Sequence, residues 1–143
     1  MIKRSLAASA WMLKADTACL SAQALLARGD VDGAANRAYY AMFAAARAAL
    51  LASGVPVKPD VGRTHSGLIG AFGQHLVKNG LVSKDMGRLL NRAHEIRQAA
   101  DYRGDSVEHV DAQEMVHQAA AFIAAMRSDC LPPAASDQET KPR

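Results

Sequence analysis

A run of small and aromatic apolar residues from Ala34 to Leu51 constrains the fold of this 143-residue chain more than any other segment. Read as a helix, it places one set of apolar side chains on a single face at spacings of three and four: Ala35, Ala38, Tyr39, Met42, Phe43, Ala46, Ala49 and Leu50. Within this run only Arg37 and Arg47 are charged. Burying a guanidinium is costly unless it is paired. The segment therefore predicts a core helix whose arginines need a carboxylate inside the fold or an anion outside it.

The composition favours an all-α protein. A chain of 143 residues suits one domain, half of its residues are apolar, and alanine and leucine dominate over strand-forming Val, Ile and Thr. A net charge of +3 permits contact with nucleic acid but does not demand it, and a solvated basic surface is the alternative. Cys19 and Cys130 lack paired spacing, so the sequence indicates no metal site, cofactor or redox pair.

The N-terminal residues resemble a signal peptide only superficially, because Lys14 and Asp16 interrupt the apolar run. Helical periodicity continues to Leu26, which indicates the first helix of a cytoplasmic protein. No stretch approaches the eighteen or so continuous apolar residues of a membrane span, so we expect no membrane partner.

Capping and helix-stopping residues divide the chain into five helices. We expect them at residues 4–28, 30–53, 64–78, 83–102 and from 111 to about 130. The N-caps would be Asp30, Thr64 and Ser83, with Asp111 and Glu114 as a capping box for the last helix. Short connections between such helices favour an antiparallel up-and-down bundle of four to five helices over residues 1–130. The polar, proline-marked residues 131–143 would form a disordered tail.

The first helix carries an apolar stripe that we expect to face the core: Leu6, Leu13, Leu20, Ala24 and Leu25. Signatures of zinc hydrolases, phosphate-binding loops and serine hydrolases do not occur in the sequence. The five histidines form no i,i+4 pair, so capping or surface roles are expected for them rather than metal ligation. His65, at a helix start, is expected to cap the helix or lie at an interface.

The segment around Arg97 is the best candidate for chemistry. Arg97 and Asp101 share a helix face, with Tyr102 adjacent. One interpretation is a surface ion pair worth less than about 1 kcal/mol. The other is a cleft between the second and fourth helices, where a cation and a phenol meet a phosphate.

Three separated segments carry a family resemblance: residues 34–43, 64–69 and 97–102. In this order they resemble small stand-alone HEPN-domain proteins, particularly the branch found beside minimal nucleotidyltransferases in bacterial toxin–antitoxin pairs. The resemblance extends from about Gly29 to Met126. It implies a helical bundle, commonly a homodimer with its cleft at the dimer interface.

The resemblance also implies a reaction. Active HEPN proteins are metal-independent endoribonucleases whose motif is an arginine followed, after four to six residues, by a histidine. The ribose 2′-OH attacks the adjacent phosphate, while arginine stabilises the developing charge and histidine moves protons. Arg97 matches the arginine, but Tyr102 holds the histidine position, and a phenol with an ordinary pKa of about 10 is a poor base. Arg103 and His109 also match the spacing, although a loop separates them.

Further positions in the segments bear on binding. Asn36 and Arg37 could line the same cleft and bind phosphate, or Arg37 could pair with Asp101 and fix two helices together. We expect Tyr39, Tyr40 and Phe43 to lie in the core rather than to stack on RNA bases. The resemblance implies two alternatives: a toxin that binds and cleaves RNA, using Arg97 with Tyr102 or His109, or a catalytically silent partner of a nucleotidyltransferase.

Overall fold

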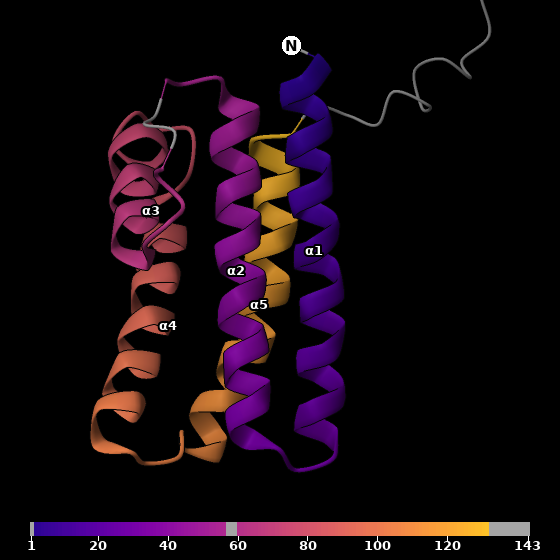
Figure 1. Cartoon of the computed structure of the whole chain (residues 1–143), viewed down its shortest axis with the longest axis vertical. Coiled ribbons are helices and arrows are strands. Elements are labelled where there is room, and N and C mark those ends of the chain that lie inside the picture. Colours follow the sequence, from indigo (N-terminus) through magenta and orange to yellow (C-terminus); the bar gives the residue numbers. More distant parts are fainter. Residues whose placement is uncertain (1, 57–59, 132–143) are drawn as a thin grey trace, which may run out of the picture.

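Five α-helices and one π-helical turn run up and down in the computed structural model, which describes residues 2–56 and 60–131 (Figure 1). The elements are α1 (Ile2–Ala27), α2 (Val31–Ser53), α3 (His65–Phe72), the π-helical turn η1 (Gly73–Val77), α4 (Lys84–Arg103) and α5 (His109–Asp129). The described ranges contain no strand, and the prediction of an all-α bundle is confirmed. From Pro132 onward the predicted tail lies outside the described residues. None of the described helices is both long and apolar enough to cross a membrane.

α2, α3 and α4 begin directly after the N-cap residues that the sequence predicts. Each predicted cap accepts a hydrogen bond from the backbone N–H three residues on, namely Asp30 from Gly33 at 2.8 Å, Thr64 from Gly67 at 2.9 Å and Ser83 from Met86 at 3.3 Å. α2 and α4 end in glycines with positive φ, Gly54 at 78° and Gly104 at 71°. Local chemistry therefore sets the ends of these helices.

The predicted start of the last helix is wrong. α5 begins at His109 with Glu108 as N-cap, and Asp111 lies inside its first turn. A carboxylate at the start of α2, distant in sequence but at the same end of the bundle, holds this chain segment: Asp32 accepts from the Val107 backbone N–H at 2.7 Å and from the Ser106 hydroxyl at 2.9 Å. The third predicted helix also differs, because it turns π-helical at Gly73.

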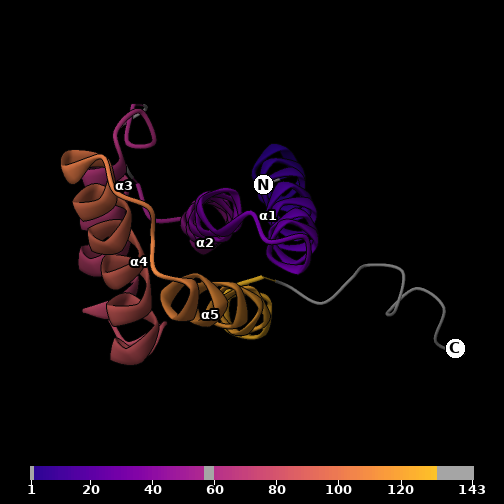
Figure 2. The same cartoon turned by 90° about the horizontal axis from the view of Figure 1, so that it is seen from below.

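α2 is the centre of the bundle. Viewed from below, it lies between α1 on one side and the α3–α4 pair on the other, with α5 alongside (Figure 2). Because neighbours surround it, its alanines are buried on several faces, including Ala34, Ala38, Ala41, Ala45 and Ala48. Small residues let the neighbouring helices approach closely.

Most of the apolar stripe predicted for α1 faces outward, contrary to expectation, whereas its Leu25 is half-buried and packs against the core. Leu6, Leu13 and Leu20 are 65%, 64% and 66% exposed. The buried face of α1 consists instead mainly of small residues: Ala8, Met12, Ala15, Ala18, Cys19 and Ala22. The physical reason is close helix packing, since an alanine face can approach the alanine-rich α2 where a leucine face cannot.

Candidate functional site

Tyr39 of α2 is the centre of a ring cluster that joins three helices. Its ring centroid lies 6.2 Å from Phe43, 5.2 Å from His65 and 5.8 Å from His94. Tyr39 is only 2% exposed, as predicted for a core residue, whereas His65 is exposed and His94 half-buried. The aromatic core of α2 therefore supports two imidazoles at the surface.

Arg97 completes this cluster from α4. Its guanidinium carbon lies 6.0 Å from the Tyr39 ring centroid, within the range of a cation–π contact. Asp101 accepts from the Arg97 guanidinium at 3.0 Å, and the Arg97 side chain is 23% exposed. The ion pair predicted from the i,i+4 spacing is present. Because Arg97 is partly buried and faces the ring cluster, the ion pair also holds its guanidinium in position beside the rings.

The two imidazoles lie within reach of each other, with ring centroids 5.9 Å apart. His65 is the first residue of α3, directly after the Thr64 cap, and His94 lies one turn before Arg97 on α4. Burial lowers the pKa of His94 from its ordinary value, and the neighbouring His65 and Arg97 act in the same direction against Glu95. His94 therefore favours the neutral form, which can accept a proton.

The Tyr39 hydroxyl is buried and has no hydrogen-bond partner among the described residues. Burial raises the pKa of this phenol to about 12, although the Arg97 charge opposes the shift, so it stays protonated. Buried polar groups without partners are uncommon in folded proteins. The cluster thus holds an unused donor beside a cation and two imidazoles.

The other predicted site residues on and after α4 lie apart from this cluster. Tyr102 is 93% exposed on the last turn of α4. Arg103 bonds to Asp105 at 3.0 Å, and His109 is exposed at the start of α5. No hydrogen bond among the described residues joins Tyr102 or His109 to Arg97.

The two arginines of α2 contact aromatic rings rather than carboxylates. The Arg37 guanidinium carbon lies 4.7 Å from the Tyr40 ring centroid, and that of Arg47 lies 4.6 Å from the Trp11 ring centroid. Asp101 pairs with Arg97, not with Arg37. Arg37 lies about 200° around the axis of α2 from Tyr39, so its side chain is directed toward α1. Asn36 is exposed and lies one turn before Tyr39.

His65 and His94 are the site residues that the sequence interpretation missed. A signal for His94 existed, because His94, Arg97 and Asp101 lie at i, i+3 and i+7 and so share one helix face. His65 lies in the family-like segment 64–69, but its position in the sequence did not indicate that it would lie near Arg97. Only the packing of α3 against α2 and α4 brings it to the cluster.

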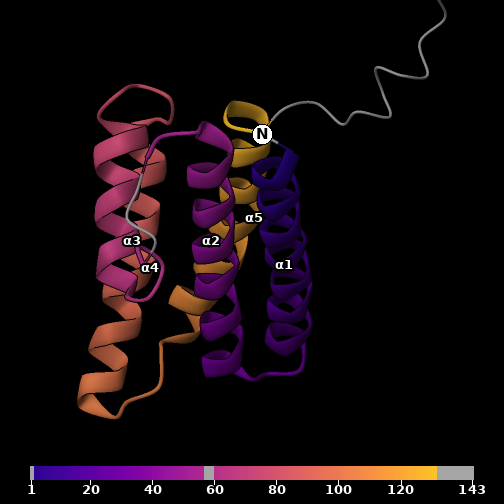
Figure 3. The same cartoon turned by 45° about the horizontal axis from the view of Figure 1, so that its top comes forward.

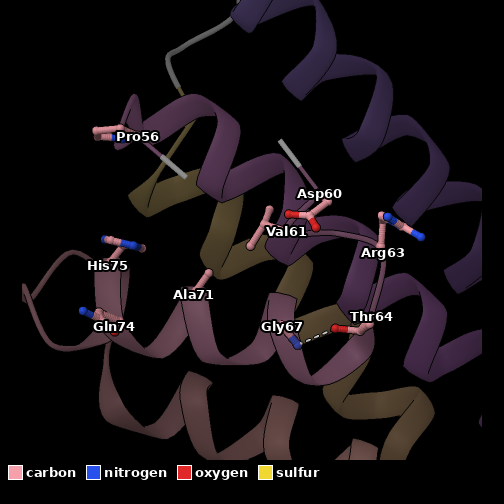
Figure 4. Close-up of a pocket in the computed structure, with 9 residues that line it drawn as sticks. All are labelled: Pro56, Asp60, Val61, Arg63, Thr64, Gly67, Ala71, Gln74 and His75. Carbon is pink, nitrogen blue, oxygen red and sulfur yellow. Dashed lines mark hydrogen bonds between the residues drawn. The ribbon is translucent and has the colours of Figure 1, made fainter. Parts of the chain in front are cut away.

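A separate hollow of about 680 Å³ lies beside α3 (Figure 4). Its lining residues come from the loop before α3 and from one side of α3 and η1: Pro56, Asp60, Val61, Arg63, Thr64, Gly67, Ala71, Gln74 and His75. No residue of the Tyr39 cluster lines it. The described residues also contain no group of three or more His, Cys, Asp or Glu side chains suited to hold a metal ion.

The fold and the site define a small helical-bundle protein with an arginine and two imidazoles gathered around a buried tyrosine. The sequence model of the HEPN domain matches residues 8–129, and the chain belongs to the HEPN domain family. The "UPF0332 protein" of Thermotoga maritima is 34% identical over 118 residues, 81% of this chain and 85% of that protein.

Two further relatives come from other organisms. The "UPF0332 protein glr0978" of Gloeobacter violaceus is 36% identical over 114 residues, 78% of this chain and 86% of that protein. The "Putative toxin MJ0605" of Methanocaldococcus jannaschii is 32% identical over 90 residues, 63% of each chain.

Proposed function

We propose that this chain is a HEPN toxin that binds RNA and cleaves it by metal-independent attack of the ribose 2′-OH. The observation that carries the proposal is the grouping of Arg97, His94 and His65 around Tyr39. Membership in the HEPN family and similarity to a relative named as a toxin support it.

The cluster supplies the three groups that such a reaction needs. Neutral His94 takes the proton from the 2′-OH, and the 2′ oxygen forms a bond to phosphorus. The Arg97 guanidinium stabilises the charge that grows on the phosphate oxygens. The bond from phosphorus to the 5′ oxygen then breaks, and the His65 imidazole donates a proton to that oxygen. The products are a 2′,3′-cyclic phosphate and a 5′-hydroxyl.

Asp101 acts on the reaction through Arg97. Its carboxylate holds the guanidinium at 3.0 Å, which limits the orientations that the arginine can adopt. Tyr102, Arg103 and His109 extend from the end of α4 to the start of α5, where they could contact RNA or a second subunit. Asn36 and Arg37 are proposed as phosphate contacts on α2, with Arg37 reaching RNA outside the cluster.

The family resemblance leads us to propose a homodimer in which two copies of this cluster face one cleft, and a nucleotidyltransferase as antitoxin. An alternative function is a catalytically silent partner of that enzyme. The specific observation in its favour is Tyr102, which replaces the motif histidine and is 93% exposed, free to be contacted by another protein.

Cleavage of a labelled RNA in EDTA tests the proposal. We expect the wild type to produce cyclic-phosphate ends, and Arg97→Ala and His94→Gln to abolish them. Arg88→Ala is the control, because Arg88 lies on the same helix and pairs with Asp85 at 2.8 Å, but is exposed and outside the cluster. If the wild type forms dimers but cuts no RNA, the silent-partner function replaces the nuclease.

A further inference from the structure

The outward face of α1 carries an exposed row of apolar and small residues at alternating spacings of four and three. We call this row the α1 seam: Leu6, Ala10, Leu13, Thr17, Leu20 and Ala24. All six residues are exposed, and the three leucines are about two-thirds exposed. This spacing is the heptad pattern by which helices pair as coiled coils. At 1.5 Å per residue the row is about 27 Å long.

We propose that the α1 seam is a self-association surface, on which α1 of a second copy of this chain packs antiparallel. A two-fold axis near Ala15 would place Leu13 opposite Thr17 of the second copy. The same operation places Leu20 opposite Ala10, and Leu6 opposite Ala24. Every leucine then meets a small residue, so the surface complements itself as a two-fold interface requires. Parallel pairing would instead set alanine against alanine and leave hollows between the helices.

The charges beside the seam are already engaged within the protomer. Asp16 accepts from the Arg127 guanidinium at 3.0 Å, and the Lys14 ammonium lies 5.7 Å from the Trp11 ring centroid. The six seam positions themselves contain no charged residue. An uncharged row bordered by polar side chains matches the apolar core and polar rim of protein interfaces.

The seam continues into a groove between α1 and α5. This groove has a volume of about 670 Å³, and its apolar walls include Leu20, Ile123 and Ala124. A helix seated on the seam would therefore also contact α5, which enlarges the buried area beyond a single helix pair. Residues 132–143 are poor candidates to cover this face, because they contain no apolar side chain larger than proline.

This surface is separate from the proposed site. α1 and α4 lie on opposite sides of α2 in two views of the bundle (Figure 2 and Figure 3). Pairing through α1 would leave the Arg97 cluster uncovered, so the proposal does not depend on the proposed function. Combined with a dimer cleft at the cluster, it would extend the assembly beyond two subunits.

Sedimentation velocity across a range of protein concentrations tests the seam. We expect the wild type to associate, and Leu13→Glu to weaken that association at least tenfold. Val110→Glu is the matched control, because Val110 is 69% exposed against 64% for Leu13 and lies on α5. Circular dichroism checks that both variants keep their helices. If the wild type and Leu13→Glu show the same mass at every concentration, the seam does not mediate association.

Cysteine cross-linking tests the antiparallel arrangement. We expect an equal mixture of Leu13→Cys and Thr17→Cys proteins to oxidise to a disulfide dimer in much higher yield than either variant alone. The native thiols should react slowly, because burial raises the pKa of Cys19 and raises that of Cys130 to about 11. Equal or higher yield from Leu13→Cys alone would show a parallel arrangement and overturn the proposed pairing.

Discussion

The guanidinium of Arg97 lies over the ring of Tyr39, with 6.0 Å between the guanidinium carbon and the ring centroid. This contact joins α2 and α4, two of the three helices that carry the family-like segments. It also places the positive charge in the ring cluster that contains His94 and His65. The replacement of the motif histidine by Tyr102 therefore does not leave Arg97 without imidazole neighbours.

Replacing Arg97 should reduce RNA cleavage without unfolding the protein. We expect Arg97→Ala to lower the rate by roughly 100-fold or more, as loss of a donor to a developing oxyanion does elsewhere. Arg97→Lys should recover only part of the rate, because an ammonium cannot bind phosphate oxygens in the planar, forked manner of a guanidinium. Initial cleavage rates in EDTA measure both, and equal rates in the wild type and Arg97→Ala would rule out this role.

His94 should make stability depend on pH. Because its pKa is lowered in the folded state, the unfolded chain takes up the proton first as pH falls below about 6.5. The free energy of unfolding should then decline with falling pH, by at most about 1.4 kcal/mol per pH unit, until the lowered pKa is passed.

Urea unfolding at pH 7.5 and pH 5.5 measures this decline. His94→Gln should make it smaller, whereas the control His117→Gln, which alters an exposed histidine on α5, should not. An unchanged decline in His94→Gln would mean that other groups cause it.

Removing the Tyr39 hydroxyl should not destabilise the fold. The buried oxygen has no partner among the described residues, so Tyr39→Phe removes a desolvated polar group while keeping the ring. We expect the free energy of unfolding to rise by about 1 kcal/mol. Chemical denaturation measures it, with Tyr40→Phe as the control. A clear loss of stability would show that the hydroxyl is hydrogen-bonded in solution. Loss of RNA binding without loss of stability would indicate that it donates to the ligand.

Asp32 should be important for the connection between α4 and α5. Its carboxylate accepts from the Val107 backbone N–H and the Ser106 hydroxyl, across 75 and 74 residues of sequence. Asp32→Ala leaves the partly buried N–H unpaired and should cost roughly 1–3 kcal/mol of unfolding free energy. Asp85→Ala, which breaks an exposed pair, should change it by less than about 1 kcal/mol. Equal effects of the two substitutions would contradict the anchoring role.

The sequence was sufficient for the features that depend on neighbouring residues. Asp30, Thr64 and Ser83 cap helices because each side chain bonds to a backbone group three residues away, whatever the rest of the fold does. The pairing of Arg97 with Asp101 is equally local, since one helical turn brings the two side chains together. The spacing of His94 and Arg97 along the helix likewise indicates that the two side chains share one face of α4.

Tertiary packing decided the remaining features. Apolar periodicity marked Leu6, Leu13 and Leu20 as core, but only the alanine face of α1 could approach the alanine-rich α2 closely enough. α5 begins at His109 rather than at the predicted Asp111. Asp32, which is distant in sequence, holds the chain segment just before this start. His65 reaches the site only because α3 packs against α2 and α4. Hydrophobicity and helical spacing are properties of single segments, whereas the choice of a packed face and the assembly of a site depend on the shapes of the neighbouring helices.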